Sequence, residues 1–185
     1  SNQIEVLRGD VANLRGQNEQ LTRGISDVQR TQKDLTQGVD ERLRKVEPLK
    51  VTVDGKEFAA ETAEKQEFEA ALATLRKGEF AGAQTSFTAF MKRHPQSGYK
   101  SSAIFWLANA QYALRDYKSA VTNFRALVTA DPEHLRAPEA LLSMANCLVE
   151  LKDAKAARKA LEELVNVYPA SEAASVAKER LSKMK

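Results

Sequence analysis

A motif that recurs at one fixed interval limits the fold of this chain more than any other feature. Alanines, bulky residues and downstream prolines all return after 37 residues, since 120 − 83 and 157 − 120 both equal 37. The recurring positions are Ala83, Ala120 and Ala157, then Phe87, Phe124 and Leu161, and finally Pro95, Pro132 and Pro169. A repeat of this length cannot bury its apolar face alone, so successive copies must stack. The sequence therefore predicts a solenoid, which offers a partner an extended binding surface.

Each repeat carries the pattern of two antiparallel helices. Apolar residues return at helical spacing from Glu64 onward, and Asp116 and Asp153 stand where helix N-caps are expected. Ser171 is the expected N-cap of a last helix that closes the stack. These signals predict an all-α solenoid of three helix pairs and a capping helix. The predicted repeats are residues 64–97, 101–134 and 138–171, and the predicted capping helix is 171–184.

The first part of the chain carries apolar side chains in alternating steps of three and four, which is the pattern of a coiled coil. The a positions are Ile4, Val11, Asn18, Ile25, Gln32 and Val39, and the d positions are Leu7, Leu14, Leu21, Val28 and Leu35. Asn18 and Gln32 are best satisfied where identical chains pair them. Residues 1–47 are therefore predicted to be an oligomerisation segment. The alternative is an amphipathic helix that folds back on its own domain.

Residues 48–63 are interpreted as a linker between this segment and a repeat domain at 64–185. Pro48 ends the long helix because it lacks an amide hydrogen. The stretch from Val51 to Lys56 alternates apolar and polar residues and then turns at Asp-Gly, which is a hairpin-like signal. One short strand has no obvious mate, so the linker interpretation is favoured.

Composition and motifs argue against several functional classes. The net charge of +3 comes from interspersed residues of both signs, without the basic stripe of a nucleic-acid binder. No apolar run approaches the roughly 18 residues that a membrane-spanning helix needs. His94 and His134 are expected to be solvated loop residues, and Cys147 a buried core thiol. We therefore predict no catalytic residue, no metal site and no cofactor.

The repeats resemble the tetratricopeptide repeat (TPR). This resemblance rests on Trp106-Leu107-Ala108, Tyr112, Asp116-Tyr117, Ala120, Phe124 and Pro132. The order of coiled coil, Val-Asp-Gly-Lys-Glu-Phe linker, three repeats and short capping helix further resembles the Tol-Pal accessory family CpoB, also called YbgF. The segments that carry this second likeness are His94-Pro95-Gln96-Ser97, Phe105-Trp106-Leu107-Ala108 and Tyr168-Pro169-Ala170-Ser171.

The resemblance implies a non-enzymatic scaffold in the periplasm of a Gram-negative bacterium, with its signal peptide removed. Members of the family self-associate through the coiled coil and bind TolA. They help to couple outer-membrane constriction to septal peptidoglycan synthesis by a bifunctional penicillin-binding protein during cell division. The alternative is a TPR adaptor of another envelope pathway, such as outer-membrane assembly or secretion.

The number of chains in the coiled coil stays open at this point. Ile or Val at a with Leu at d favours two strands. In contrast, Arg42 and Leu43 with Val46 and Glu47 resemble a signature of trimeric coils, which requires a shift of register after Val39. The family resemblance also implies three chains. We expect a homotrimer, with a dimer as the alternative.

In a TPR stack the first helix of each repeat lines the concave side. Three sets of equivalent positions on these helices predict a partner-binding groove. The sets are Phe68, Phe105 and Leu142, then Leu72, Asn109 and Asn146, and finally Leu75, Tyr112 and Val149. Side-chain amides in such a groove can bond to the backbone of an extended peptide. The alternative is that several of these residues, Phe105 above all, pack between helices.

Overall fold

The computed structural model describes residues 2–46 and 48–184, which fall into two compact units. The first unit consists of helix α1 (Asn2–Val46), and the second begins at Pro48 and contains the other elements. The side chains from Arg44 to Glu47, which include half of the trimer signature, lie outside the described residues.

Helix α1 presents its predicted seam as an exposed apolar stripe. Every seam residue is exposed in the single chain, with Leu21 63% and Val28 65% accessible. Gly9, Gly16 and Gly24 lie off the seam, and each weakens an isolated helix by about 1 kcal/mol relative to alanine. A helix of this composition therefore depends on neighbouring helices for its stability. No helix in residues 2–46 or 48–184 is both long enough and apolar enough to span a bilayer.

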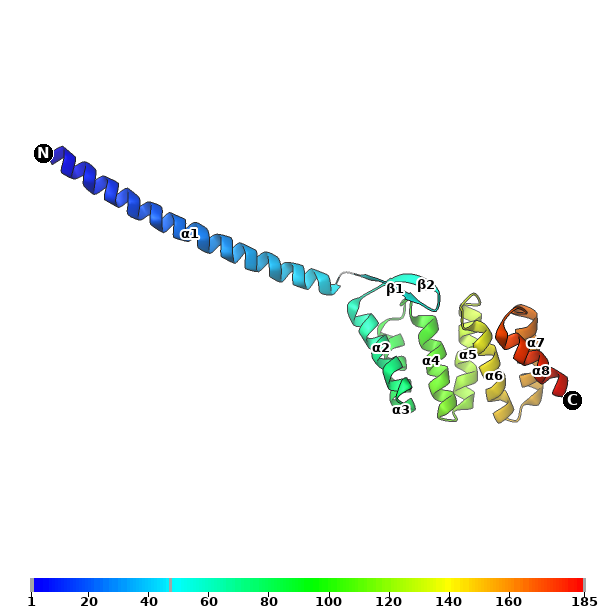
Figure 1. Cartoon of the computed structure of the whole chain (residues 1–185). Helices are drawn as coiled ribbons and strands as arrows, with labels where there is room; N and C mark the ends of the chain where they lie inside the picture. The colour runs from blue at the N-terminus through cyan, green and yellow to red at the C-terminus, as the bar shows by residue number, and fades with distance from the viewer. Residues whose placement is uncertain (1, 47, 185) are drawn as a thin grey trace. The chain divides into compact units, whose positions relative to one another are not determined.

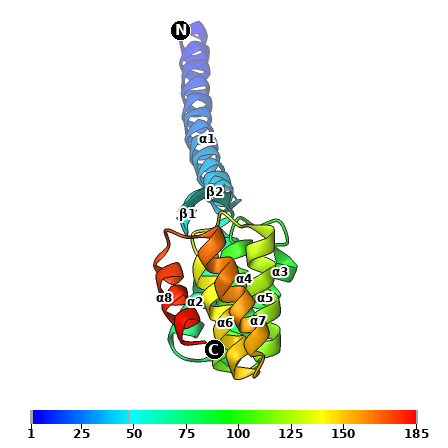
Figure 2. The same ribbon diagram turned by 90° about the vertical axis from the view of Figure 1, so that its right-hand side faces the viewer.

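The second unit stacks its helices in chain order, which confirms the predicted helix pairs and capping helix (Figures 1 and 2). The helices are α2 (Thr62–Arg76), α3 (Phe80–Arg93), α4 (Lys100–Ala113), α5 (Tyr117–Ala130), α6 (Ala137–Glu150), α7 (Ala154–Val167) and α8 (Glu172–Lys183). The predicted N-caps form as expected. The carboxylates of Asp116 and Asp153 and the hydroxyl of Ser171 each accept a hydrogen bond from a backbone N–H of the following helix.

The turn inside each helix pair adopts the same left-handed conformation. The residue at this position is Gly78 in the first repeat, with φ 81°, but Arg115 and Lys152 in the others, with φ 62° and 61°. A left-handed conformation costs a residue with a Cβ atom roughly 1–2 kcal/mol. The repeats therefore keep one turn geometry even where the side chain opposes it, because the stacking of both flanking helices fixes the turn.

Two buried clusters fill the stack between the helices. The first joins α2, α3 and α4, and its centre is aromatic: the Phe68 ring lies 4.4 Å from Tyr99, 6.0 Å from Phe87 and 5.8 Å from Phe90. The second runs from α4 to α8 and includes Cys147, which is buried as predicted. Burial raises the pKa of the Cys147 thiol to about 11, so this cysteine stays a protonated core residue.

The linker interpretation of residues 48–63 is wrong, because this segment forms a β-hairpin. Strand β1 (Leu49–Val53) pairs antiparallel with β2 (Lys56–Ala60). Asp54 and Gly55 both have positive φ, 47° and 80°, which makes a two-residue type I′ turn. The sequence of β2 does not indicate a strand, because its apolar and polar residues do not alternate clearly, although it directly follows the Asp-Gly turn.

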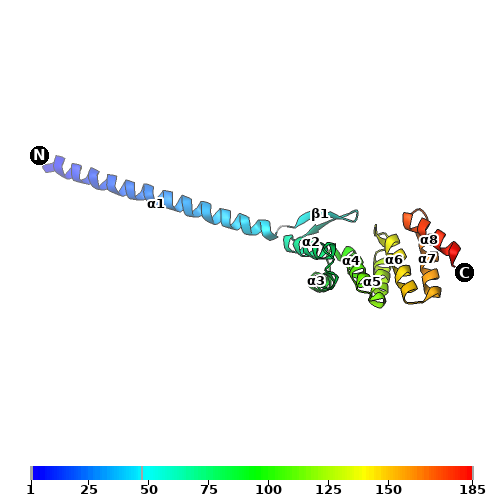
Figure 3. The ribbon, with the colours of Figure 1, turned by 60° about the horizontal axis from the view of Figure 1, so that its bottom comes forward.

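The hairpin packs on the first helix pair rather than standing free (Figure 3). Val51 and Ala60 are buried in the first core cluster, and the ring of Phe58 meets the edge of Tyr99 at 4.8 Å. A Cβ atom at Gly98 would lie 2.2 Å from the Phe58 ring, so only glycine lets β2 approach this closely. The hairpin is therefore a fixed part of the repeat unit.

Candidate partner-binding surfaces

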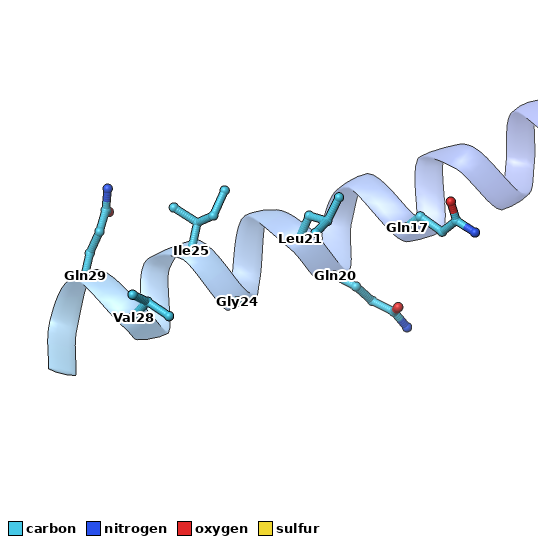
Figure 4. A pocket seen from close by; sticks show the side chains of 7 residues that line it. All are labelled: Gln17, Gln20, Leu21, Gly24, Ile25, Val28 and Gln29. Carbon is cyan, nitrogen blue, oxygen red and sulfur yellow. The ribbon is translucent and has the colours of Figure 1, made fainter. Parts of the chain in front are cut away.

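The seam of α1 is the first candidate surface. Leu21 and Ile25 project from the same side of the helix, and together with Gly24 and Val28 they line a hollow of about 660 Å³ (Figure 4). A second hollow of about 420 Å³ surrounds Ile4, Leu7 and Val11 in the same way. In a coiled coil, side chains of a neighbouring helix fill such hollows. The two hollows therefore have the form that a knobs-into-holes interface requires, and the role of the seam residues in oligomerisation stays a prediction.

The second candidate surface is a pocket of about 790 Å³ beside the hairpin. Its walls are strand β1 and helices α2 and α4, and Arg136 from the start of α6 lies at its end. The lining residues outside β1 are Asp54, Lys65, Phe68, Glu69, Leu72, Arg76, Tyr99, Trp106 and Arg136. The pocket therefore combines an apolar floor with charged side chains around it.

The structure corrects two of the predicted groove residues. Phe68 and Phe105 are only 2% and 0% exposed, and both belong to the buried clusters. Phe105 meets Phe124 of α5 with ring centroids 6.0 Å apart, so it packs between helices, the alternative considered above. Because one residue turns a helix by about 100°, the next position along α4 is Trp106, which is half-buried and lines the pocket.

The other predicted groove residues are at least partly accessible. Leu72, Leu75, Asn109, Leu142 and Asn146 are half-buried, and Leu72 also lines the pocket beside β1. The two remaining residues are more open, Tyr112 at 38% and Val149 at 53%. Their role in partner binding stays a prediction.

The two asparagines already have partners within the fold. The Nδ2 group of Asn109 donates to the carbonyl oxygen of Phe105 over 2.9 Å, and Oδ1 of Asn146 accepts from the Arg180 guanidinium of α8. Each side-chain amide has further hydrogen-bonding capacity, since it offers two donors and an acceptor with two lone pairs. A bound peptide backbone can use the groups that remain.

A polar cluster ties the hairpin turn to the rest of the repeat unit. We call it the hairpin cluster, and it consists of Asp54, Lys56, Ser101, Ser102, Asp131, His134 and Arg136. The Asp54 carboxylate accepts from Ser102 Oγ at 2.6 Å and from Arg136 Nε at 2.7 Å. The Lys56 ammonium lies 2.7 Å from the Asp131 carboxylate. These contacts join residues that lie 48 to 82 positions apart in the sequence, which is why no local pattern reveals them.

Arg136 also links this cluster to the pocket. Its guanidinium carbon lies 4.6 Å from the centroid of the Trp106 ring and 5.1 Å from that of Phe105. This stacking is a cation–π contact, and it positions Trp106 at the pocket wall. The sequence pattern identifies Trp106 only as a residue of the repeat motif. Its place one position after a buried phenylalanine on the same helix is the signal that could have identified it as a pocket residue.

The expectation that His134 is a solvated loop residue is wrong, because this side chain is only 4% exposed. Its Nδ1 atom accepts from the backbone N–H of Arg136 at 3.2 Å. Nε2 therefore carries the proton and donates to Ser102 Oγ at 3.3 Å, since the Ser102 hydroxyl itself donates to Asp54. Both ring nitrogens of neutral His134 therefore have hydrogen-bond partners. A proton added to Nδ1 would point at the N–H of Arg136, so protonation would break this hydrogen bond.

We expect acid to destabilise the repeat unit through His134. Burial lowers the pKa of this imidazole below its usual 6.5, although nearby Asp54 and Asp131 oppose the shift, while Lys56 and Arg136 reinforce it. The unfolded chain then binds the proton more readily, so His134 favours folding fully above about pH 6.5 and progressively less as pH falls. Urea unfolding of residues 48–185 from pH 8 to pH 5 measures this loss.

The variant His134→Gln should flatten that pH dependence, whereas His94→Gln, outside the hairpin cluster, should keep it. If the free energy of unfolding of His134→Gln fell between pH 7 and pH 5 as steeply as that of the unmodified protein, His134 would not be the source of the pH dependence.

In the part of the chain that the structure describes, no three His, Cys, Asp or Glu side chains come close enough together to hold a metal ion. His94 instead pairs with Glu67, Nε2 to Oε2 at 3.2 Å. Burial acts to raise the pKa of Glu67, but hydrogen bonds from Arg93 and His94 outweigh it and lower this pKa.

The exposed seam and the stacked helix pairs define a non-enzymatic scaffold, in which a coiled-coil segment carries a TPR-type protein-binding unit. Residues 60–185 match the family described as outer membrane lipoprotein, YfiO, so the chain belongs to this family. Residues 1–52 match TolA binding protein trimerisation, which favours three chains over two. The two matches on one chain confirm the resemblance to CpoB/YbgF, and both families indicate the Gram-negative envelope. No curated protein sequence matches the chain.

Solved structures confirm the fold of the repeat unit. PcrH, known from Pseudomonas aeruginosa, in complex with the chaperone binding region of PopB has 18% identity and a TM-score of 0.56, and the match covers 68% of this chain and 97% of PcrH. Yersinia enterocolitica SycD with a YopD peptide has 18% identity and a TM-score of 0.56, with coverage of 68% and 91%. The Arabidopsis OM64 TPR domain has 20% identity and a TM-score of 0.55, with coverage of 66% and 97%.

Proposed function

We propose that this chain is a periplasmic scaffold that forms a homotrimer through α1 and binds TolA and a bifunctional penicillin-binding protein through its TPR unit. In this role it coordinates outer-membrane constriction with septal peptidoglycan synthesis during cell division. The observation that carries the proposal is the presence of both family matches on one chain, a TolA-binding trimerisation segment followed by a TPR-like unit.

The geometry supports this function in two ways. The seam of α1 leaves apolar residues such as Leu21 and Val28 exposed until other chains cover them. The repeat unit offers accessible polar and aromatic side chains on its first helices, Asn109 and Tyr112 among them. Joining several repeat units on one coiled coil raises the effective concentration of binding sites, so weak contacts of each unit add up to firm attachment.

A second candidate function is an adaptor of outer-membrane assembly or secretion. The match of residues 60–185 to the outer membrane lipoprotein family YfiO favours it. The two candidates share a TPR unit that binds protein and differ in the partner. Crosslinking of the chain in cells, followed by identification of the captured protein, separates them: TolA supports the first, and an assembly or secretion component supports the second.

We expect the double variant Asn109→Ala with Tyr112→Ala to weaken TolA binding by roughly tenfold, because it removes amide hydrogen bonds and an aromatic contact surface. Calorimetric titration of TolA measures the affinity, and circular dichroism checks that the helices remain. The control is Thr85→Ala with Lys92→Ala on α3, which should bind TolA normally. Equal affinities of both variants would move the site away from α4.

A further inference from the structure

The hairpin leaves one edge of β1 unpaired. In the described residues β1 has β2 as its neighbouring strand, and Val53 pairs with Lys56 across the turn. A two-residue turn makes that closing pair a hydrogen-bonded one, and such pairs alternate along an antiparallel ladder with pairs that are not bonded. The backbone N–H and C=O groups of Lys50 and Thr52 therefore point away from β2.

This free edge faces the pocket beside the hairpin. Lys50 and Thr52 both line the pocket, whose far wall is made by α2 and α4. Among the described residues, no hydrogen bond uses the outward N–H or C=O groups of these two residues. An unpaired strand edge is a ready template for a further strand. The space across the pocket, about 790 Å³, gives that strand a place to lie.

The two faces of such a strand would meet different surroundings. On the face shared with buried Val51, alternate side chains would lie against Leu72 and Trp106, which are half-buried in the pocket wall. On the opposite face, the other side chains would stand next to Lys50, which is exposed. The pocket therefore selects alternating apolar and polar side chains.

The charges of the pocket decide the sign of those polar side chains. Arg136 is bound to Asp54 at 2.7 Å, and Lys65 lies 3.8 Å from Glu69. Two further cations line the pocket and have no ion pair among the described residues, namely Lys50 and Arg76. A segment with acidic side chains would neutralise them.

We propose that the free edge of β1 binds an extended segment of a partner protein as a third strand, with alternating apolar and acidic side chains. The apolar side chains contact Leu72 and Trp106, the acidic ones lie beside Lys50, and Arg76 adds to the positive charge of the pocket. The proposal rests on the proposed function for the partner's identity, and it adds the chemistry and backbone conformation of the bound segment.

The first test uses a short synthetic peptide of alternating valine and glutamate, titrated calorimetrically into the full chain. We expect binding that slows hydrogen exchange of the Lys50 and Thr52 amides, which become strand donors. A peptide with lysine in place of glutamate should bind roughly tenfold more weakly, because it loses the attraction to the cations of the pocket. A peptide that is N-methylated on alternate residues should also bind roughly tenfold more weakly, because it loses backbone hydrogen bonds to β1. Absence of binding, or equal binding of all three peptides, would overturn the proposal.

The second test uses two proline variants of the same hairpin. Thr52→Pro removes an N–H from the free edge of β1 without breaking a β1–β2 hydrogen bond, since proline is tolerated where the N–H faces outward. Glu57, the register partner of Thr52, is exposed and points its backbone to the opposite edge of the hairpin. Glu57→Pro is therefore the matched control. We expect Thr52→Pro to lower the affinity for the valine–glutamate peptide roughly tenfold and Glu57→Pro to leave it unchanged.

Thermal unfolding of both variants checks that the hairpin stays docked. If Thr52→Pro alone unfolds the hairpin, Thr52→N-methylated threonine, introduced by ligation, takes its place. If Thr52→Pro and the unmodified chain bound the valine–glutamate peptide with equal affinity, this result would contradict strand addition.

Titration of TolA into the unmodified chain and into Thr52→Pro distinguishes failure of this proposal from failure of the proposed function. If TolA binds the unmodified chain but not Thr52→Pro, both stand. If TolA binds the two equally, TolA attaches elsewhere, and strand addition fails for TolA while the proposed function survives. If TolA binds neither, yet the valine–glutamate peptide still distinguishes Thr52→Pro from Glu57→Pro, the edge site stands and the proposed function fails.

Discussion

Removal of residues 1–47 is expected to convert a trimer into a folded monomer. The two buried clusters that stabilise the repeat unit consist of residues within 48–184. The seam of α1, in contrast, gains its stability only when neighbouring chains cover it. Sedimentation equilibrium should give three chains for the full protein and one chain for residues 48–185, while circular dichroism of the fragment stays helical.

Paired aspartate variants test the same interface without shortening the chain. Leu14→Asp with Leu21→Asp places charges at two d positions of the seam. Each lost leucine contact costs on the order of 2–5 kcal/mol, and the buried charges add to this, so the trimer should dissociate at micromolar concentration. The control is Asn13→Asp with Ser26→Asp, both off the seam and outside the hollows that line it, which adds the same charge and should remain trimeric. A trimer in the seam variant would contradict the coiled coil.

Replacement of Asp54 is expected to give the second largest effect, a loss of about 2–4 kcal/mol in the free energy of unfolding of residues 48–185. Its side chain is 7% exposed and accepts hydrogen bonds from Ser102 and Arg136. Asp54→Ala leaves both donors without this partner, although Arg136, at 29% exposure, regains part of its hydration. Alanine also fits the left-handed turn poorly. Urea unfolding at pH 7 measures the loss.

Two further variants separate the causes of that effect. Asp54→Asn keeps a residue that suits a type I′ turn and can still accept a hydrogen bond, so it isolates the lost charge and should cost about half as much. Glu57→Ala, at an exposed site of the same hairpin, should change stability by less than about 0.5 kcal/mol. If Asp54→Ala were as stable as Glu57→Ala, the hairpin cluster would not hold the hairpin in place.

The helices of this protein were predictable because their signals are local and repeated. Asp116 and Asp153 mark the same N-cap one period apart, and the stacking of identical units repeats each signal. The hairpin was only half predictable. Its Asp54-Gly55 turn is a strong local signal, but β2 is held by Phe58 against Tyr99 and by distant ion pairs, which adjacent residues do not encode.

The partner-binding surfaces were predictable to different degrees for the same reason. The seam of α1 follows a period that one helix alone defines, and its residues are all exposed in the single chain. On the repeat unit, a shift of one residue exchanges a core position for a surface position, as Phe105 and Trp106 show. The contribution of β1 to the pocket depends on docking over a long sequence distance, and His134 is buried by the same docking.

We infer from the proposed function that trimeric chains bind TolA through the repeat unit. Calorimetric titration of the periplasmic part of TolA into both the full chain and residues 48–185 tests it most directly. We expect the same intrinsic affinity per chain for both proteins, because the proposed binding surface lies wholly after residue 47. Absence of binding to either protein, or binding to the full chain alone, would contradict it.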